Sequence, residues 1–248
     1  MKKSPLLFFL FSLIACDENE KTHQSHPRID FQKIEFDHQV DGDFEKLSIT
    51  FSYVDDDDDF GLDGTLAEHS MPPYQRGFYF LKSTGEMITS DKLLNHEISL
   101  DELIRLDDKA VAPFDTLPDL SPCFYYSYNA TGVWTDTESI YWVLNKNYYN
   151  LFVEFFYQDA DGQYVEFDFH ETFCFSFDAR VFAGSGVEGP FSVHRVNQRI
   201  TSITYTMHSL GFIAIFGDKK MKLRIHIQDR ALNKSNVIET PEFVLGEI

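Results

Sequence analysis

The sequence predicts an all-β protein folded as an antiparallel sandwich. Several segments alternate apolar with polar side chains, short polar turns separate them, and aromatic residues make up 16% of the 248 residues. Aromatic side chains favour pleated, half-buried surfaces, and many short strands joined by short turns are typical of a sandwich. At most one short helix is expected, where Ser99 and Glu102 fit a capping box ahead of the apolar residues Leu103, Ile104 and Leu106.

The first clear strand covers residues 47–54. Its apolar side chains are Leu47, Ile49, Phe51 and Tyr53. They alternate with the polar side chains Lys46, Ser48, Thr50 and Ser52. A period of two places the apolar set on one buried face of a sheet. Residues 77–81 and 141–144 are expected to be two further short strands.

The C-terminal half is expected to hold most of the strands. Residues 149–158 are apolar on both faces, as in a central strand, and an Asp-Gly turn at Gly162 joins them to residues 164–169 in a hairpin. The remaining strands are expected at residues 200–207, 211–216, 221–228 and 237–245. In residues 221–228, apolar side chains alternate with Lys222, Arg224 and His226, which predicts one buried and one exposed face.

The N-terminus is expected to carry an export signal. Lys2 and Lys3 precede an apolar run of about ten residues, which is too short to span a bilayer. The run ends Leu-Ile-Ala-Cys at Cys16, which resembles the lipobox of bacterial lipoproteins. The resemblance implies a signal peptide at residues 1–15, lipidation of Cys16, and a polar tether at residues 16–28. An ordinary secretory signal or a short buried helix is the alternative.

The acidic residues after Cys16 resemble the surface-export signals of Bacteroidetes. They are Asp17, Glu18 and Glu20. The resemblance implies a lipid-anchored protein of the outer membrane in the cell envelope. A generic polar tether is equally compatible with the periplasmic face, so the sequence leaves the face open.

The net charge of −19 limits the partners. Nucleic acid is excluded because phosphate contacts need a basic surface. Anionic membrane surfaces would repel the chain, so its contact with the membrane is expected to be the N-terminal lipid. An acidic surface suits divalent cations or cationic partners.

An acidic run after the strand at residues 47–54 is the sharpest candidate site. Asp55, Asp57, Asp59 and Asp63 recur at alternate positions, and carboxylates in a bent loop can converge on Ca²⁺, which takes six to eight oxygens. The loop is not an EF-hand, because positions six and twelve counted from Asp55 are Phe and Leu. A solvated acidic loop without a metal is the alternative.

Two covalent features are also candidates. Cys123 and Cys174 could form a disulfide in the oxidising envelope, worth about 4 kcal/mol in the chain-entropy model, or remain two buried thiols. The segment Asp115-Thr116-Leu117 resembles the short O-glycosylation signal of exported Bacteroidetes proteins, which makes Thr116 a weak candidate.

Two segments carry a family resemblance. Residues 47–62 contain a strand followed by the acidic loop, and residues 223–241 contain Asp-Arg-Ala-Leu-Asn-Lys-Ser-Asn. They resemble an uncharacterised family of Bacteroidetes lipoproteins with a "DGDGDIG"-like loop and a "DRALNKSN"-like hairpin. Here Asp56 and Asp58 replace the usual glycines of the loop, which adds like charge and stiffens the turn.

The resemblance implies an immunoglobulin-like sandwich over residues 29–248, with its first strand at residues 29–36. Residues from about 55 to 148 would then form a long insertion. Two small sandwiches split near Pro122 are the alternative. The family has no established activity to carry over.

The absence of a reactive motif favours a protein that is not an enzyme. The sequence has no Gly-x-Ser-x-Gly elbow, P-loop or dinucleotide fingerprint. A non-catalytic binding or structural module is expected, with an unknown protein or glycan as partner. An envelope glycan-processing hydrolase using paired carboxylates is one alternative. A carbohydrate-binding accessory lipoprotein that stacks sugars on Trp134, Tyr141 and Trp142 is another.

Overall fold

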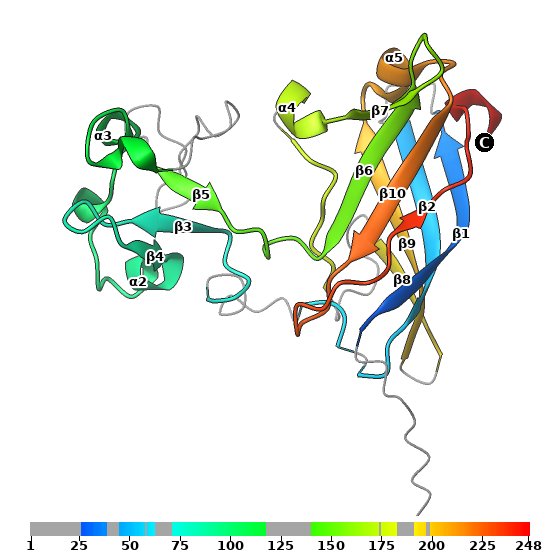
Figure 1. Cartoon of the computed structure of the whole chain (residues 1–248). Helices are drawn as coiled ribbons and strands as arrows, with labels where there is room; N and C mark the ends of the chain where they lie inside the picture. The colour runs from blue at the N-terminus through cyan, green and yellow to red at the C-terminus, as the bar shows by residue number, and fades with distance from the viewer. Residues whose placement is uncertain are drawn as a thin grey trace, which may run out of the picture.

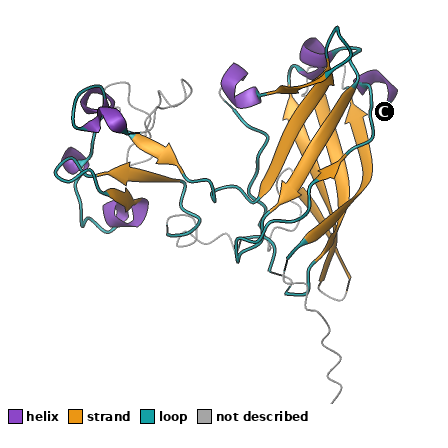
Figure 2. Ribbon diagram, in the orientation of Figure 1, coloured by secondary structure: helices purple, strands orange, loops and turns teal. Residues whose placement is uncertain are grey.

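The computed structural model describes residues 26–38, 45–57, 59–62, 71–117, 140–173, 175–182, 191–196 and 199–248. In these ranges the chain forms a β-sandwich and a smaller unit built on a three-stranded sheet (Figure 1). Strands dominate the sandwich, whereas the smaller unit combines short strands with short helices (Figure 2). The smaller unit is inserted in the chain between two strands of the sandwich.

The first sheet of the sandwich has the strand order β1-β2-β9-β8, and all its pairs are antiparallel. Its strands are β1 (Arg28–Asp37), β2 (Glu45–Val54), β8 (Phe191–Val196) and β9 (Arg199–Ser209). Leu47, Ile49 and Phe51 on β2 are completely buried, as their alternation predicted.

The second sheet has the order β11-β10-β6-β7 and is also antiparallel. Its strands are β6 (Leu151–Gln158), β7 (Tyr164–Phe167), β10 (Met221–Ile227) and β11 (Ile238–Glu239). Taken in chain order, the two sheets have the A-B-E-D and G-F-C arrangement of an immunoglobulin-like sandwich, with one extra strand beside C. This confirms the predicted fold class. The first sheet takes strands from both sides of Pro122, so the sandwich is not split there.

The core lies between the two sheets. Phe155 on β6 is 2% exposed, and four phenylalanine rings surround it at centroid distances of 4.9–6.0 Å. They are Phe169, Phe177, Phe212 and Phe216. The high aromatic content of the sequence is therefore used in the core, where large rings bury much apolar area.

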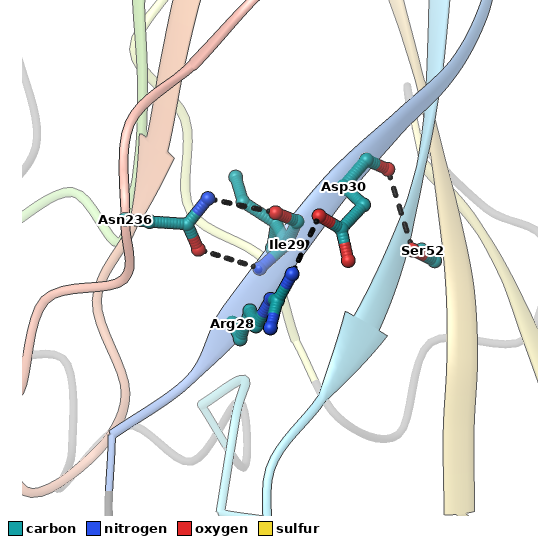
Figure 3. A network of polar contacts seen from close by, with 5 residues as sticks. All are labelled: Arg28, Ile29, Asp30, Ser52 and Asn236. Carbon is teal, nitrogen blue, oxygen red and sulfur yellow. Dashed lines mark hydrogen bonds and ion pairs between the residues drawn. The ribbon is translucent and has the colours of Figure 1, made fainter.

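A side-chain amide joins the two sheets at the first strand. Asn236, in the segment before β11, accepts a hydrogen bond from the Ile29 N–H at 3.0 Å and donates one to the Ile29 C=O at 2.8 Å (Figure 3). On the other side of β1, Ser52 donates a hydrogen bond to the Asp30 C=O at 3.3 Å. The start of β1 is thus held by both sheets.

The inserted unit has its own sheet, in the order β4-β3-β5. Its elements are β3 (Gly77–Phe80), β4 (Met87–Thr89), α2 (Ser90–Leu94), η1 (Leu100–Glu102), α3 (Leu106–Lys109), η2 (Phe114–Thr116) and β5 (Trp142–Leu144). Two small apolar clusters stabilise it, and Leu103, Ile104 and Tyr141 in them are completely buried.

The expectation of at most one helix is wrong. The described part of the chain has four short α-helices, of which α4 (Phe169–Phe173) and α5 (Phe212–Phe216) belong to the sandwich, and η4 (Leu245–Glu247) ends it. The Ser99 N–H does bond to the Glu102 carboxylate at 2.8 Å, but only one 3-10 turn follows. Leu103 leaves the turn to pair with Leu81, and α3 starts separately.

Residues 211–216 form a helix where a strand was expected. A short apolar run does not distinguish a strand from a buried helical turn, and here α5 buries Phe212 and Phe216, four residues apart, on one side. The expected strand at residues 237–245 is also reduced to the two residues of β11. The Thr240 N–H still bonds to the Leu223 C=O of β10, but Pro241 has no N–H for the ladder, and the next bridge to β10 forms at Phe243.

Candidate metal centre

Three carboxylates converge at one end of the sandwich. Asp55 follows β2 directly, Asp59 lies four residues later in the same loop, and Asp229 follows β10. One carboxylate oxygen from each lies within 4.8 Å of the others. The two loops meet because β2 and β10 end at the same end of the sandwich, where β1 begins opposite Val54.

The loop after β2 curls around the Asp55 carboxylate. Asp55 is 7% exposed, and the Tyr53 hydroxyl donates a hydrogen bond to it at 2.6 Å. The backbone N–H groups of Asp57 and Asp59 lie at 3.4 Å from its two oxygens. Phe60 is buried, and its ring packs against the Tyr53 ring at a centroid distance of 5.2 Å. This contact holds the loop to β2 just after Asp59.

Asp229 is held by its own turn. It is 3% exposed, and Asn233 donates two hydrogen bonds to its carboxylate, from the backbone N–H at 2.7 Å and from the side-chain amide at 2.9 Å. The Asp229 N–H bonds to the Asn233 C=O at 3.0 Å.

The surroundings of Asp59 disfavour its charged form. Its Oδ1 is buried and has no hydrogen-bond partner among the described residues. Burial, the negative charge of Asp229, and a hydrogen bond and charge from Asp55 raise the pKa of Asp59 to about 6, against a smaller lowering by the backbone of Ala231. Among the described residues, the groups that shift this pKa are carboxylates and one backbone group, and none of them is a basic side chain.

The donor set suits a hard divalent cation. Carboxylate oxygens are the ligands that Ca²⁺ prefers, and three of them supply part of its six to eight oxygen contacts. Asp55, Asp59 and Asp229 are therefore the residues that could hold such an ion, with water in the remaining positions. A bound ion would also remove the repulsion between the three charges.

The structure brings together only part of the predicted ligand set. Asp55 and Asp59 belong to the group, whereas Asp57 is exposed and outside it. Asp63 lies outside the described residues. Asp229 was missed because an Asp with an Asn four residues later reads as a turn that bonds its own backbone. The signal that could have identified it is topological: the second strand and the strand at residues 221–228 of an immunoglobulin-like sandwich end at the same end.

The carboxylate cluster lies next to the start of the inserted unit, and Arg230 links the two. Its backbone N–H bonds to the Asp59 C=O at 3.3 Å and its side chain to the Gly61 C=O at 2.5 Å. Its own C=O accepts a hydrogen bond from the Tyr74 hydroxyl. Arg180 donates to the Tyr74 C=O at 3.1 Å, which holds Tyr74 from the sandwich side.

The other predicted sites have different outcomes. Thr116 is exposed at the end of η2, where a modifying enzyme could reach it. Cys16, Cys123, Cys174 and Trp134 fall in segments that the structure does not describe. Tyr141 is 0% exposed and Trp142 is 6% exposed, so these two side chains do not form a surface on which sugars stack.

Within the described ranges, none of the helices combines the length and apolar character needed to cross a membrane. The chain was also compared with protein-family models, with curated proteins and with solved structures. None of the three comparisons finds a match.

Proposed function

We propose that this chain is a lipid-anchored protein of the outer membrane with no catalytic role, a binding or structural module that calcium stabilises. The observation that carries the proposal is the convergence of Asp55, Asp59 and Asp229 from two connections of the sandwich. Three carboxylates so close together repel one another unless a cation is present. Bound Ca²⁺ would join the two connections and stiffen this end of the sandwich.

The position of the centre supports a role in presenting the inserted unit. The loop that supplies Asp59 leads into that unit, and Arg230 contacts both the loop and Tyr74. The first strand begins at the same end. A lipid at Cys16 would hold the protein at the membrane, and a stiffened sandwich would offer the inserted unit to an unknown protein or glycan.

The calcium part is tested by thermal unfolding of the full chain in detergent at pH 7.5, with calcium and with a chelator. A ligand at 100 times its dissociation constant stabilises the folded state by about 2.7 kcal/mol, so calcium should raise the melting temperature clearly. Asp59→Asn and Asp229→Asn should each remove most of that rise.

Asp57→Asn is the matched control. It removes one carboxylate from the same acidic run, but from an exposed position outside the cluster, so the response to calcium should be retained. An equal response in all three variants, or none in the unsubstituted chain, would reject the calcium part. The binding part is tested separately with glycan arrays and envelope extracts, and failure to retain any component would count against it.

A further inference from the structure

The two outward faces of the sandwich differ in composition. On the first sheet, β2 and β9 present small hydroxyl side chains that bond to one another, Ser48 to Thr206 and Thr50 to Thr204, each at 2.9 Å. Such a face is typical of the solvated side of an antiparallel sheet. The outward face of the second sheet instead carries large aromatic and charged side chains.

We call this second surface the aromatic face. Its members come from all four strands and from the turn before β11, and they are Phe152, Glu154, Phe156, Tyr164, Glu166, Lys222, Arg224, His226, Lys234 and Glu239. The strand registers place Arg224 between Glu154 and Glu239, and Phe156 between Lys222 and Glu166. Directly opposite residues share one side of an antiparallel pair, so these side chains point away from the core.

Cationic groups lie over the rings of the aromatic face. The Arg224 guanidinium is 4.7 Å from the Phe156 centroid, and the Lys222 ammonium is 4.5 Å from that of Tyr164. The His226 ring stacks on Phe152 at 4.5 Å with an angle of 8° between the planes. These contacts fix long side chains in place and lower the entropy lost when a partner covers them.

The aromatic face is balanced in charge although the chain is strongly acidic. Glu239 bonds to Lys222 and to Arg224, both at 2.9 Å. Its basic members are Lys222, Arg224 and Lys234, and its acidic members are Glu154, Glu166 and Glu239. The named members therefore include as many basic as acidic side chains. The whole chain has a net charge of −19. This is therefore a surface where a second acidic chain could approach without net repulsion.

We propose that a second copy of this chain docks on the aromatic face, around a two-fold axis parallel to the strands and between β6 and β10. The basic side chains Lys222 and Arg224 lie on β10. Glu154 lies on the neighbouring strand β6, directly opposite Arg224. Rotation about this axis lays β10 of one copy over β6 of the other, and Arg224 of each copy then faces the partner's Glu154. The same contact forms twice, as a two-fold interface requires.

Two features favour a second copy over other occupants. Cationic groups already cover the Phe156 and Tyr164 rings, so a sugar cannot lie flat on them there. An axis along the strands also keeps the two N-terminal ends at one end of the pair, so both tethers can run to the same membrane. The pairing does not depend on the calcium centre.

The test is the mass of the full chain by sedimentation equilibrium, in a detergent matched in density to the buffer. The unsubstituted chain should have the mass of a dimer. Arg224→Glu and Glu154→Arg should each raise the dissociation constant about tenfold or more, because each opposes like charges twice across the axis. An equimolar mixture of the two variants should form the heterodimer, since both cross-axis pairs are then of opposite charge.

Recovery in the mixture distinguishes a lost interface from a damaged fold, because a misfolded chain would not recover its partner. Lys46→Glu, a charge reversal on the outward face of the first sheet, is the control and should leave the dimer unchanged. A monomer for the unsubstituted chain would overturn the proposal. A dimer that persists in both reversals, or a mixture that stays monomeric, would overturn it equally.

Discussion

The Asn236 amide pairs with both backbone polar groups of Ile29, so one side chain takes the place of a neighbouring strand. Ile29 is completely buried, and unpaired polar backbone groups there would lose their hydration without compensation. The contact joins the start of β1 to the segment before β11, across the edge of the sandwich.

Replacing Asn236 should therefore destabilise the sandwich. Asn236→Ala removes a donor and an acceptor together and should lower the free energy of unfolding by about 1–3 kcal/mol. Chemical denaturation of the full chain measures the change. Asn95→Ala, at an exposed position after α2, is the control and should stay within about 0.5 kcal/mol. Equal losses for both variants would mean that the Ile29 contact has no special role.

Gly77 should not accept a larger side chain. A Cβ at this position would lie 2.5 Å from Cε3 of Trp142 and 2.8 Å from the Val143 C=O. Gly77→Ala should cost about 1–3 kcal/mol, because the backbones of β3 and β5 must separate. The loss should appear as faster hydrogen exchange in β3 and β5, with the sandwich unchanged. Gly246→Ala meets open space and should have no effect on exchange in the inserted unit.

The aromatic core should depend on Phe155 far more than on its periphery. Phe155→Ala should lower the free energy of unfolding by about 3–5 kcal/mol, since four rings pack around a side chain that is 2% exposed. Phe173, which is 49% exposed, contacts only the edge of the same cluster. Phe173→Ala should cost less than half as much in the same denaturant titration.

The acidic cluster should give the calcium-free protein an unusual pH dependence. Because the pKa of Asp59 is raised from 3.8 to about 6, the folded state binds more protons than the unfolded chain between these values. This group therefore stabilises the fold below pH 4, and the contribution is lost as the pH rises through 6.

The comparison with Asp59→Asn isolates this effect. Without calcium, the unsubstituted chain should lose stability relative to the variant as the pH rises from 4 to 7. With calcium the difference should reverse at pH 7, because the metal binds the deprotonated carboxylates. Parallel stability curves for the two proteins in chelator would contradict the assigned pKa.

Much of the sandwich could be predicted from alternation alone. Residues 47–54 and 221–228 have strict two-residue periods, and their apolar sets are buried as predicted. Prediction failed where a segment is too short for a period to develop. Residues 211–216 contain six residues, and only the surrounding rings determine that a helical turn fits there better than a strand. The edge strand β8 and the three-residue strand β4 were missed for the same reason.

The candidate site was half predicted. The acidic run after a strand indicated Asp55 and Asp59, because both are close in sequence. Asp229 is 170 positions away from Asp59, and only the pairing of β10 with β6 brings it to the same end of the sandwich. Asp57 lies at the same two-residue spacing, but its carboxylate is outside the cluster of Asp55, Asp59 and Asp229. The bend of the loop, and not the spacing in the sequence, decides which carboxylates meet.

The long connection between β2 and β6 has a consequence for the order of folding. The hairpins β1–β2, β3–β4, β6–β7 and β8–β9 pair residues that are close along the chain, so each can form early. The pairing of β3 with β5, which completes the inserted sheet, joins Gly77 to Leu144 and closes a loop less than half as long as the one between β2 and β9. The pairing of β2 with β9 joins Ser52 to Ser202 and closes by far the longest loop of these. Because closing a long loop is slow, this pairing should be the late step in folding, and the inserted sheet should already be complete when it occurs.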